Sequence, residues 1–272
     1  MTAPVPTPSA LSRGNQRIKA AHKLGRRATR AEARLFLADG PKAVASALAV
    51  PHCVQEVFAT AAASAAYGEL RHVAAERWTL VEDSALGLLS DSVTPAGMVA
   101  VCRFLDRPLS ATLEAANLVA ICADIRDPGN AGTVVRTCDA AGGDAVVFAG
   151  TSVDAYNPKT VRASVGSLFH LPISTGVTPE QAIAVAHDSG LTVLAADVAG
   201  ELDLDEAGDL LRGPTAWMFG NEARGLPAPV AGLADVRVRI PIYGRAESLN
   251  LSTAAALCLY ASARAQRRER PL

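Results

Sequence analysis

The sequence has none of the patterns that mark a secreted, membrane-spanning or zinc-binding protein. Its five cysteines are odd in number and scattered, without a Cys-x-x-Cys pair or neighbouring histidines that could complete a zinc site. No uninterrupted apolar stretch reaches the roughly 18 residues of a membrane helix, and the proline-rich start MTAPVPTPSA lacks the charged and apolar regions of a signal peptide. We therefore expect a cytoplasmic protein with reduced thiols, no membrane span and no bound metal.

Positive charge is unevenly distributed along the chain. The net charge is −1, yet eight lysines and arginines lie between residues 13 and 34, where Glu32 is the only acidic residue. Such a segment attracts polyanions, of which nucleic-acid phosphate backbones are the commonest. It predicts RNA contacts from Arg17, Lys19, Lys23, Arg26, Arg27 and Arg30.

Apolar runs and breaks divide the chain into four parts. We expect residues 1–30 to form a basic flexible leader, and the short alternating strands and helices of 31–104 to form a small α/β domain. The pattern breaks over 105–117, a predicted linker that carries Pro108. Over 118–272 the predicted strands are nearly continuous apolar runs, as expected of a parallel sheet covered by helices on both faces. The predicted fold class is α/β for both domains.

Three polar, glycine-containing segments follow strands of the second domain, at residues 124–142, 220–225 and 240–256. Ligands of open parallel sheets bind outside the carboxyl ends of the strands, so these segments predict one site. Gly129 and Gly132 lack the register of a dinucleotide-binding loop, and no Gly-Lys-Ser/Thr follows for a P-loop. A nicotinamide-dependent oxidoreductase is therefore disfavoured.

The same segments carry a resemblance. The pattern Asn130-x-Gly132-x-x-x-Arg136, then FGNEARGLP, then IPIYGRAESLNLSTAAALCLY resembles the three motifs of the SpoU (TrmH) family of RNA ribose methyltransferases. SVDAYNPKTVRASVGSLFHLPI also resembles that family, and FLADGPKAVASAL resembles the start of its ribosomal-protein-like RNA-binding domain. The likeness covers nearly all the chain after residue 30. It implies a parallel-sheet (SPOUT) domain with a deep trefoil knot, a small N-terminal RNA-binding domain, and a homodimer paired through the knot.

The resemblance also implies the cofactor, S-adenosylmethionine, bound mainly by backbone groups of the loops. An apolar slot beside glycine turns suits an adenine ring. The residues expected to contact the cofactor are Ala196, Asp197, Phe219, Gly220, Asn221, Ile240, Ile242, Leu249 and Leu251.

Arg136 matches the essential arginine of the family, which has been described there as a general base. Free guanidinium titrates above about 12, so we favour a cation that holds a phosphate and stabilises the developing alkoxide. The expected catalytic set is completed by Asn130, Glu222, Ser248 and Asn250. Plainer alternatives are a salt bridge from Glu222 to Arg224 and helix caps for the other three. Lys159 and Arg162 are expected at an RNA phosphate, with a solvated helix face as the alternative.

These expectations combine into one predicted function. The protein is predicted to transfer a methyl group from S-adenosylmethionine to a ribose 2'-hydroxyl, in ribosomal RNA because an added N-terminal domain suits a large folded substrate. A tRNA 2'-O-methyltransferase and a non-catalytic RNA-binding member of the fold are the alternatives. The modified nucleotide and a role in antibiotic resistance are left open by the sequence.

Overall fold

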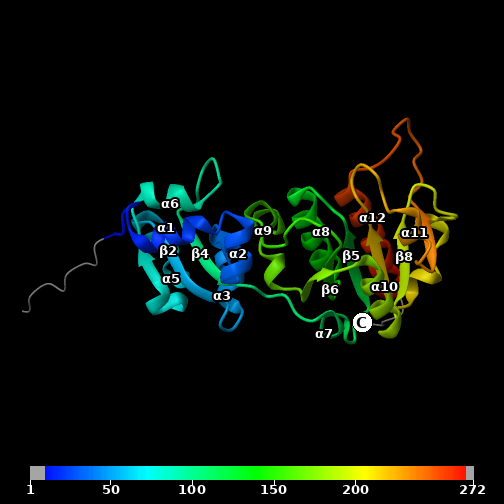
Figure 1. Cartoon of the computed structure of the whole chain (residues 1–272), viewed down its shortest axis with the longest axis horizontal. Coiled ribbons are helices and arrows are strands. Elements are labelled where there is room, and N and C mark those ends of the chain that lie inside the picture. The colour runs from blue at the N-terminus through cyan, green and yellow to red at the C-terminus, as the bar shows by residue number, and fades with distance from the viewer. Residues whose placement is uncertain (1–9, 268–272) are drawn as a thin grey trace, which may run out of the picture. The chain divides into compact units, whose positions relative to one another are not determined.

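The structure, a computed structural model, describes residues 10–267. This part of the chain forms two compact units, coloured by residue number in Figure 1. The N-terminal unit comprises the described residues up to Phe104 together with Tyr156–Arg162, and the C-terminal unit comprises Leu105–Ala155 and the described residues from Ala163 onward. Within residues 10–267, no helix is long and apolar enough to cross a membrane.

A mixed four-stranded sheet forms the centre of the N-terminal unit. Its order is β1-β4-β2-β3; β4 pairs antiparallel with β1 and β2, and β3 pairs parallel with β2. The strands are β1 (Leu35–Asp39), β2 (Val54–Ala59), β3 (Trp78–Leu80) and β4 (Met98–Arg103). The helices are α1 (Gln16–Lys23), α2 (Arg27–Ala33), α3 (Pro41–Ala49), α4 (Ala61–Ala66), α5 (Gly68–Ala74), the 3-10 turn Ala75–Arg77 and α6 (Asp83–Leu89). Helices α4 and α5 are separated at Tyr67, where φ is −120° and ψ is 51°.

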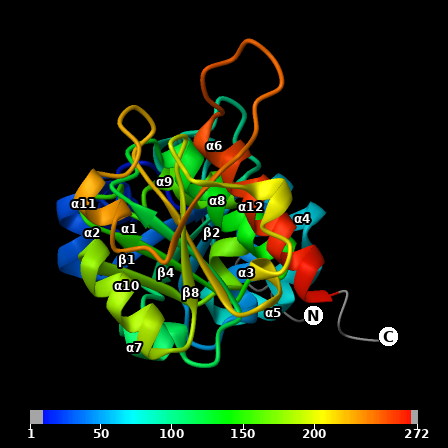
Figure 2. The same cartoon turned by 90° about the vertical axis from the view of Figure 1, so that its right-hand side faces the viewer.

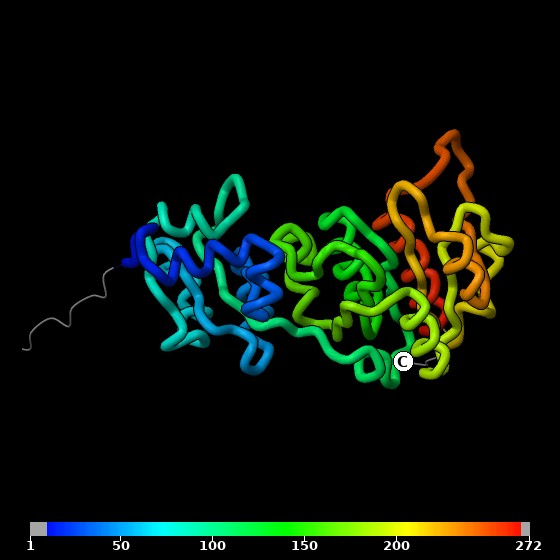
Figure 3. Tube along the Cα trace, viewed as in Figure 1, coloured from blue at the N-terminus to red at the C-terminus, as the bar shows by residue number. Residues whose placement is uncertain are grey.

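The predicted flexible leader is instead folded over much of its length, and its first nine residues lie outside the described part. Helices α1 and α2 form the blue segment of the trace in Figure 3. Ile18, Ala21 and Leu24 are at most 4% exposed and pack with Phe58 and Val99 in one apolar cluster. Their spacing of three residues makes a buried stripe between the cations, so this segment belongs to the N-terminal unit.

A seven-stranded sheet, parallel throughout, forms the centre of the C-terminal unit and confirms the predicted fold class. In spatial order its strands are β7 (Ile173–Val177), β6 (Ala145–Ala149), β5 (Leu118–Ala123), β10 (Thr215–Phe219), β8 (Thr192–Ala196), β11 (Val236–Arg239) and β9 (Leu202–Asp203). The sequence did not predict β7, whose sequence ISTGV is interrupted by polar residues and glycine, or β9, which has two residues.

Helices and short turns connect these strands. They are α7 (Leu109–Leu113), α8 (Pro128–Ala141), α9 (Pro158–Ser164), the 3-10 turn Ser167–Phe169, α10 (Pro179–Asp188), the 3-10 turns Leu204–Glu206 and Leu210–Arg212, α11 (Ala228–Ala231) and α12 (Leu251–Arg267). Helix α10 begins with a capping box formed by Thr178 and Gln181. The predicted linker carries α7, whose Leu113 is fully buried in the core of the C-terminal unit.

The chain after β11 returns across the sheet. Helix α12 contacts α8, β10, β5 and the 3-10 turn Leu210–Arg212, and Figure 2 shows it beside α8. A buried 2.9 Å hydrogen bond from Nε1 of Trp217 to Oγ of Ser262 fastens α12 to β10. The knot that the resemblance implies depends on this return. This return of the chain brings the three motif segments to one edge of the sheet.

Candidate active site

The loops after β5 and β10 are joined through Glu222. Its carboxylate accepts hydrogen bonds from the backbone N–H groups of Arg126 at 3.0 Å and Asp127 at 2.9 Å. The amide Nδ2 of Asn221 donates to the carbonyl of Asp124 at 3.0 Å. Partial burial raises the pKa of Glu222, but the hydrogen bonds from Asp127 and Arg126 outweigh it, so this pKa lies below its ordinary value of 4.5. Glu222 is therefore an ionised brace between the first two motifs at neutral pH.

The third motif joins the same network through two asparagines. Nδ2 of Asn130 lies 3.4 Å from Glu222, and Oδ1 of Asn130 accepts a 3.1 Å hydrogen bond from Nδ2 of Asn250. Oδ1 of Asn250 accepts from the backbone N–H and hydroxyl of Ser252, at the start of α12. The amide oxygen of Asn250 thus caps α12, as the helix-cap alternative expected, and its amide nitrogen donates to Asn130. Three of the predicted catalytic residues form one chain of hydrogen bonds.

Arg136 lies apart from this network. It is exposed on α8, and six residues of helix separate it from Asn130 by about 9 Å along the axis. Within the described part of the chain it makes no hydrogen bond or ion pair with Asn130 or Glu222. Within one described chain, Glu222 therefore contacts neither Arg136 nor Arg224 through a hydrogen bond or ion pair. The carboxylate binds backbone N–H groups instead, because the loops after β5 and β10 approach so closely.

A cavity of about 350 Å³ lies at the carboxyl ends of β8, β10 and β11. All nine residues expected to contact the cofactor line it, together with Glu222 and Ser248. The residues that sequence reasoning did not assign to it are Val198, Ala223, Arg224, Gly225, Leu226, Val238 and Ala254. Four of these belong to FGNEARGLP, so their place in the motif was the available signal. Val198 and Val238 carry no such signal, since each is a single apolar residue near a strand end.

Gly220 makes the second motif fold back on itself. A Cβ at this position would overlap the backbone of Gly225 and Leu226. Asn221 and Gly225 exchange two backbone hydrogen bonds, of 3.0 and 2.8 Å, and Gly225 has a φ of +64°. The loop is therefore a tight turn that presents backbone groups to the cavity.

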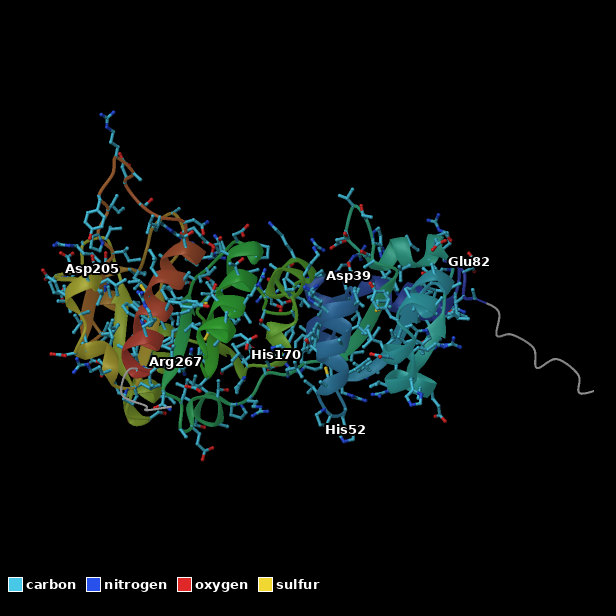
Figure 4. The ribbon with its side chains drawn as sticks, turned by 180° about the vertical axis from the view of Figure 1, so that it is seen from behind. Asp39, His52, Glu82, His170, Asp205 and Arg267 are labelled. Atoms are coloured by element: carbon cyan, nitrogen blue, oxygen red, sulfur yellow. The ribbon has the colours of Figure 1, made fainter. Side chains whose placement is uncertain are left out.

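The loop between β11 and α12 covers another side of the cavity. It carries Ile240, Ile242 and Ser248 and stands out in orange in Figure 3. The hydroxyl of Tyr243 donates a 2.6 Å hydrogen bond to Asp205, which is labelled in Figure 4. This bond ties the loop to the 3-10 turn after β9.

Among the described residues, no cysteine or histidine lines this cavity. All five thiols are buried, and burial raises the pKa of Cys138 to about 12. His170 and His187 lie at hydrogen-bond distance from Asp139 and Asp235, at 2.8 and 3.0 Å. No cluster of three or more histidine, cysteine, aspartate or glutamate residues within 10–267 could hold a metal ion.

The predicted RNA-contacting cations differ in their surroundings. Lys19, Lys23, Arg26, Arg27 and Lys159 are exposed, and Arg162 is half-buried.

The remaining two predicted contacts are engaged within the N-terminal unit. Arg17 forms an ion pair with Glu56 and donates to Oγ1 of Thr79 at 2.9 Å. Arg30 is only 1% exposed, and its guanidinium donates at 2.8 Å to the carbonyls of Leu24 and Gly25. The prediction for Arg30 is wrong, because this side chain binds the carbonyl groups that follow α1 and is not available to RNA.

Comparisons with known proteins agree with this geometry. Residues 117–260 match the SpoU rRNA Methylase family, and residues 15–100 match the MRM3-like substrate binding domain. The chain is 32% identical over 251 residues to a 23S rRNA guanosine 2'-O-methyltransferase of Bacillus subtilis, covering 90% of this chain and 95% of the relative.

Two solved structures resemble the whole chain. The SpoU methyltransferase AviRb of Streptomyces viridochromogenes, in complex with S-adenosylmethionine, matches with a TM-score of 0.83 and 28% identity over 94% of this chain and all of the other. An S-adenosylmethionine-bound rRNA methyltransferase of Sinorhizobium meliloti matches with a TM-score of 0.80 and 29% identity over 95% and 97% of the two chains.

Fold and site together define an RNA ribose methyltransferase that uses S-adenosylmethionine. The chain belongs to the SpoU rRNA methylase family, and it has a substrate-binding domain at its N-terminal side. The family, enzyme class and cofactor predicted from the motifs are thereby confirmed. The roles of the individual site residues stay predictions.

Proposed function

We propose that this protein methylates a ribose 2'-hydroxyl of 23S ribosomal RNA in the cytoplasm. Family membership supports the reaction. The Bacillus subtilis relative, which aligns with 90% of the chain, supports large-subunit RNA as the substrate. The observation that carries the proposal is the hydrogen-bonded chain of Glu222, Asn130 and Asn250, which draws three motif segments together beside one cavity.

The cavity residues fit S-adenosylmethionine. Gly220 lets the backbone of the second motif come close to a ligand, and Ile240, Leu249 and Leu251 supply an apolar wall for an adenine ring. When bound, the cofactor supplies an electrophilic methyl group. Phe219 and Asn221 complete the wall from the end of β10.

Arg136 holds the substrate in this proposal. Its guanidinium is exposed and carries five N–H donors suited to a phosphate. A neighbouring positive charge stabilises the alkoxide that forms as the 2'-hydroxyl oxygen attacks, while the hydroxyl proton leaves to water or a phosphate oxygen. In this proposal Asn130 and Ser248 orient the ribose.

A second copy of the chain completes the site in our proposal. Arg136 is absent from the residues that line the cavity, so one chain does not bring it to the cofactor wall. Helix α12 exposes Leu257 and Tyr260, each 44% accessible and three residues apart. These side chains provide an apolar face for a partner, and Leu257→Glu should convert the dimer into monomers in sedimentation velocity.

The central test is transfer of labelled methyl from S-adenosylmethionine to 23S rRNA, with the modified nucleotide then mapped in RNA from cells with and without the protein. Arg136→Ala should abolish transfer and leave cofactor binding unchanged in calorimetry. Transfer to tRNA alone would replace the proposed substrate. Cofactor binding without transfer to any RNA would favour the non-catalytic alternative.

A further inference from the structure

A second arginine at the site is ordered by its neighbours. Arg126 lies in the loop after β5, and its exposed side chain donates a 2.7 Å hydrogen bond to Oγ1 of Thr151. Its backbone N–H is held by Glu222 at 3.0 Å. Both ends of the residue are therefore fixed, although the guanidinium itself faces solvent.

The support for this side chain extends to Asp124. Oδ1 of Asp124 accepts hydrogen bonds from both the N–H and the hydroxyl of Thr151, at 2.7 and 2.6 Å. The carbonyl of Asp124 is held by Asn221 of the second motif. A chain of hydrogen bonds therefore runs from Asn221 of the second motif through Asp124 and Thr151 to the exposed guanidinium of Arg126.

Two features of the backbone favour this chain of hydrogen bonds. Asp124 itself has a φ of +57°, which is costly for a residue with a side chain. Gly150 has a φ of +66°, and a Cβ there would overlap the Asp124 carboxylate. The left-handed backbone of Asp124 and the missing side chain of Gly150 together leave the Asp124 carboxylate at hydrogen-bond distance from Thr151.

The exposed group of this hydrogen-bonded chain is the guanidinium of Arg126, which can bind an anionic ligand. Arg126 and Arg224 both lie close enough to Asp124 to lower the pKa of its carboxyl, after the larger effect of the Thr151 hydrogen bonds. Arg126 therefore lies near two carboxylates, those of Asp124 and Glu222, and its position is fixed by hydrogen bonds to Thr151 and Glu222. The guanidinium of Arg126 uses one N–H on Thr151, so its remaining donors can bind a second group. Glu222, which holds its backbone, lines the cavity.

We propose that Arg126 binds a backbone phosphate of the substrate RNA beside the cofactor cavity, with Thr151 and Asp124 as its positioning residues. This inference rests on the proposed RNA methyltransferase function. It assigns Arg126 a role separate from that of Arg136, since Arg126 fixes the strand and does not act on the reacting hydroxyl. A phosphate held by an ordered arginine lowers the KM for RNA more than it raises kcat.

The test uses four full-length variants. Arg126→Met removes the charge, Arg126→Lys keeps it, and Thr151→Val removes the hydroxyl that orders it. Arg212→Met is the matched control, because Arg212 pairs with Asp209 just before β10, at the amino end of the sheet. Each is assayed for kcat and KM with the rRNA substrate, for RNA binding at several salt concentrations, and for S-adenosylmethionine binding without RNA.

Arg126→Met should raise the KM for RNA by about tenfold or more, with kcat within about twofold of the wild type. Its log–log salt slope for RNA binding should fall by about 0.7–0.9, which corresponds to one phosphate contact. Arg126→Lys should recover part of the loss, and Thr151→Val should raise KM by a few fold. The control should behave as the wild type.

Two results would overturn the inference. One is an active Arg126→Met enzyme whose KM and salt slope are unchanged. The other is weakened S-adenosylmethionine binding in the absence of RNA, which would assign Arg126 to the cofactor carboxylate. A wild-type protein that methylates no RNA would instead overturn the proposed function, and the inference with it.

Discussion

The motif loops of the C-terminal unit and the basic helices of the N-terminal unit both concentrate polar residues, and they use them differently. In the loops, Glu222 binds two backbone N–H groups and a side-chain amide, and each partner lies at a fixed distance. In the segment that carries α1 and α2, four predicted cations, Lys19, Lys23, Arg26 and Arg27, are exposed to solvent. We therefore expect ligand binding by the motif loops to depend on the exact positions of their atoms, and RNA binding by the segment of α1 and α2 to depend on its total charge.

This difference predicts how each region responds to change. A geometric site fails when one atom is misplaced, because its members hold each other in position. A charged surface loses affinity in small steps, because each phosphate contact contributes separately to counterion release. Substitutions in the two regions should therefore differ in the size of their effects.

Gly220→Ala should have the largest effect. The added Cβ would overlap the backbone of Gly225 and Leu226, so the turn must open. We expect a loss of about 1–3 kcal/mol in stability and roughly a tenfold to hundredfold loss in S-adenosylmethionine affinity by calorimetry. Gly213→Ala is the control, since nothing lies within 4 Å of a Cβ there and the backbone is extended, with φ −78° and ψ 172°. Equal cofactor affinity in both variants would contradict this account.

Glu222→Gln should destabilise the protein by about 1–3 kcal/mol at pH 7, because an amide cannot accept both backbone hydrogen bonds as the carboxylate does. The folded-state pKa of Glu222 is lowered from 4.5. Its contribution is therefore fully present above that value and is lost as the pH falls below it. Urea unfolding should show the gap between wild type and variant shrinking from pH 7 towards pH 4.

The control for this experiment is Glu247→Gln, an exposed position in the loop of the third motif with no hydrogen bond in the described part of the chain. It should unfold like the wild type at both pH values. A Glu222→Gln gap that stays constant between pH 7 and pH 4 would mean that the carboxylate charge is not what braces the loops.

The same contrast explains how far the sequence could be interpreted. Apolar runs predicted the parallel sheet, and the resemblance of the motif segments to the SpoU family supplied the nine expected cofactor residues, all of which line one cavity. Those signals are local, because a strand end and a tight turn are specified by a few adjacent residues. β9 was missed since a two-residue strand leaves no periodicity.

Partners of long side chains were harder to predict. The binding of Glu222 to Arg126 and Asp127 depends on how closely two loops approach, and they are nearly 100 residues apart in the chain. Arg30 and Arg27 carry the same charge three positions apart, yet one is buried. The sequence gives both residues the same charge, and only the packing of the fold determines which of them is buried.

Arg30→Met should separate stability from RNA binding in the N-terminal unit. The substitution leaves the carbonyls of Leu24 and Gly25 without their donor, so we expect a loss of about 1–3 kcal/mol. Arg27→Met, at an exposed position on α2, should leave the free energy of unfolding within about 0.5 kcal/mol of the wild type. Thermal or urea unfolding would check both, and an Arg30→Met protein of unchanged stability would return Arg30 to the RNA-binding surface.

The exposed cations of α1 and α2 should give the smallest individual effects. Lys23→Ala and Arg27→Ala should each weaken RNA binding by a few fold and reduce the log–log salt slope by at most about 0.9, because each removes at most one phosphate contact. Combining the two should add their effects, since separated charges act independently. Arg71→Ala, an exposed cation on α5, is the control. A loss from Lys23→Ala as large as that from Arg126→Met would show that this surface, too, binds RNA through one ordered contact, and the distinction between a geometric site and a charged surface would then fail.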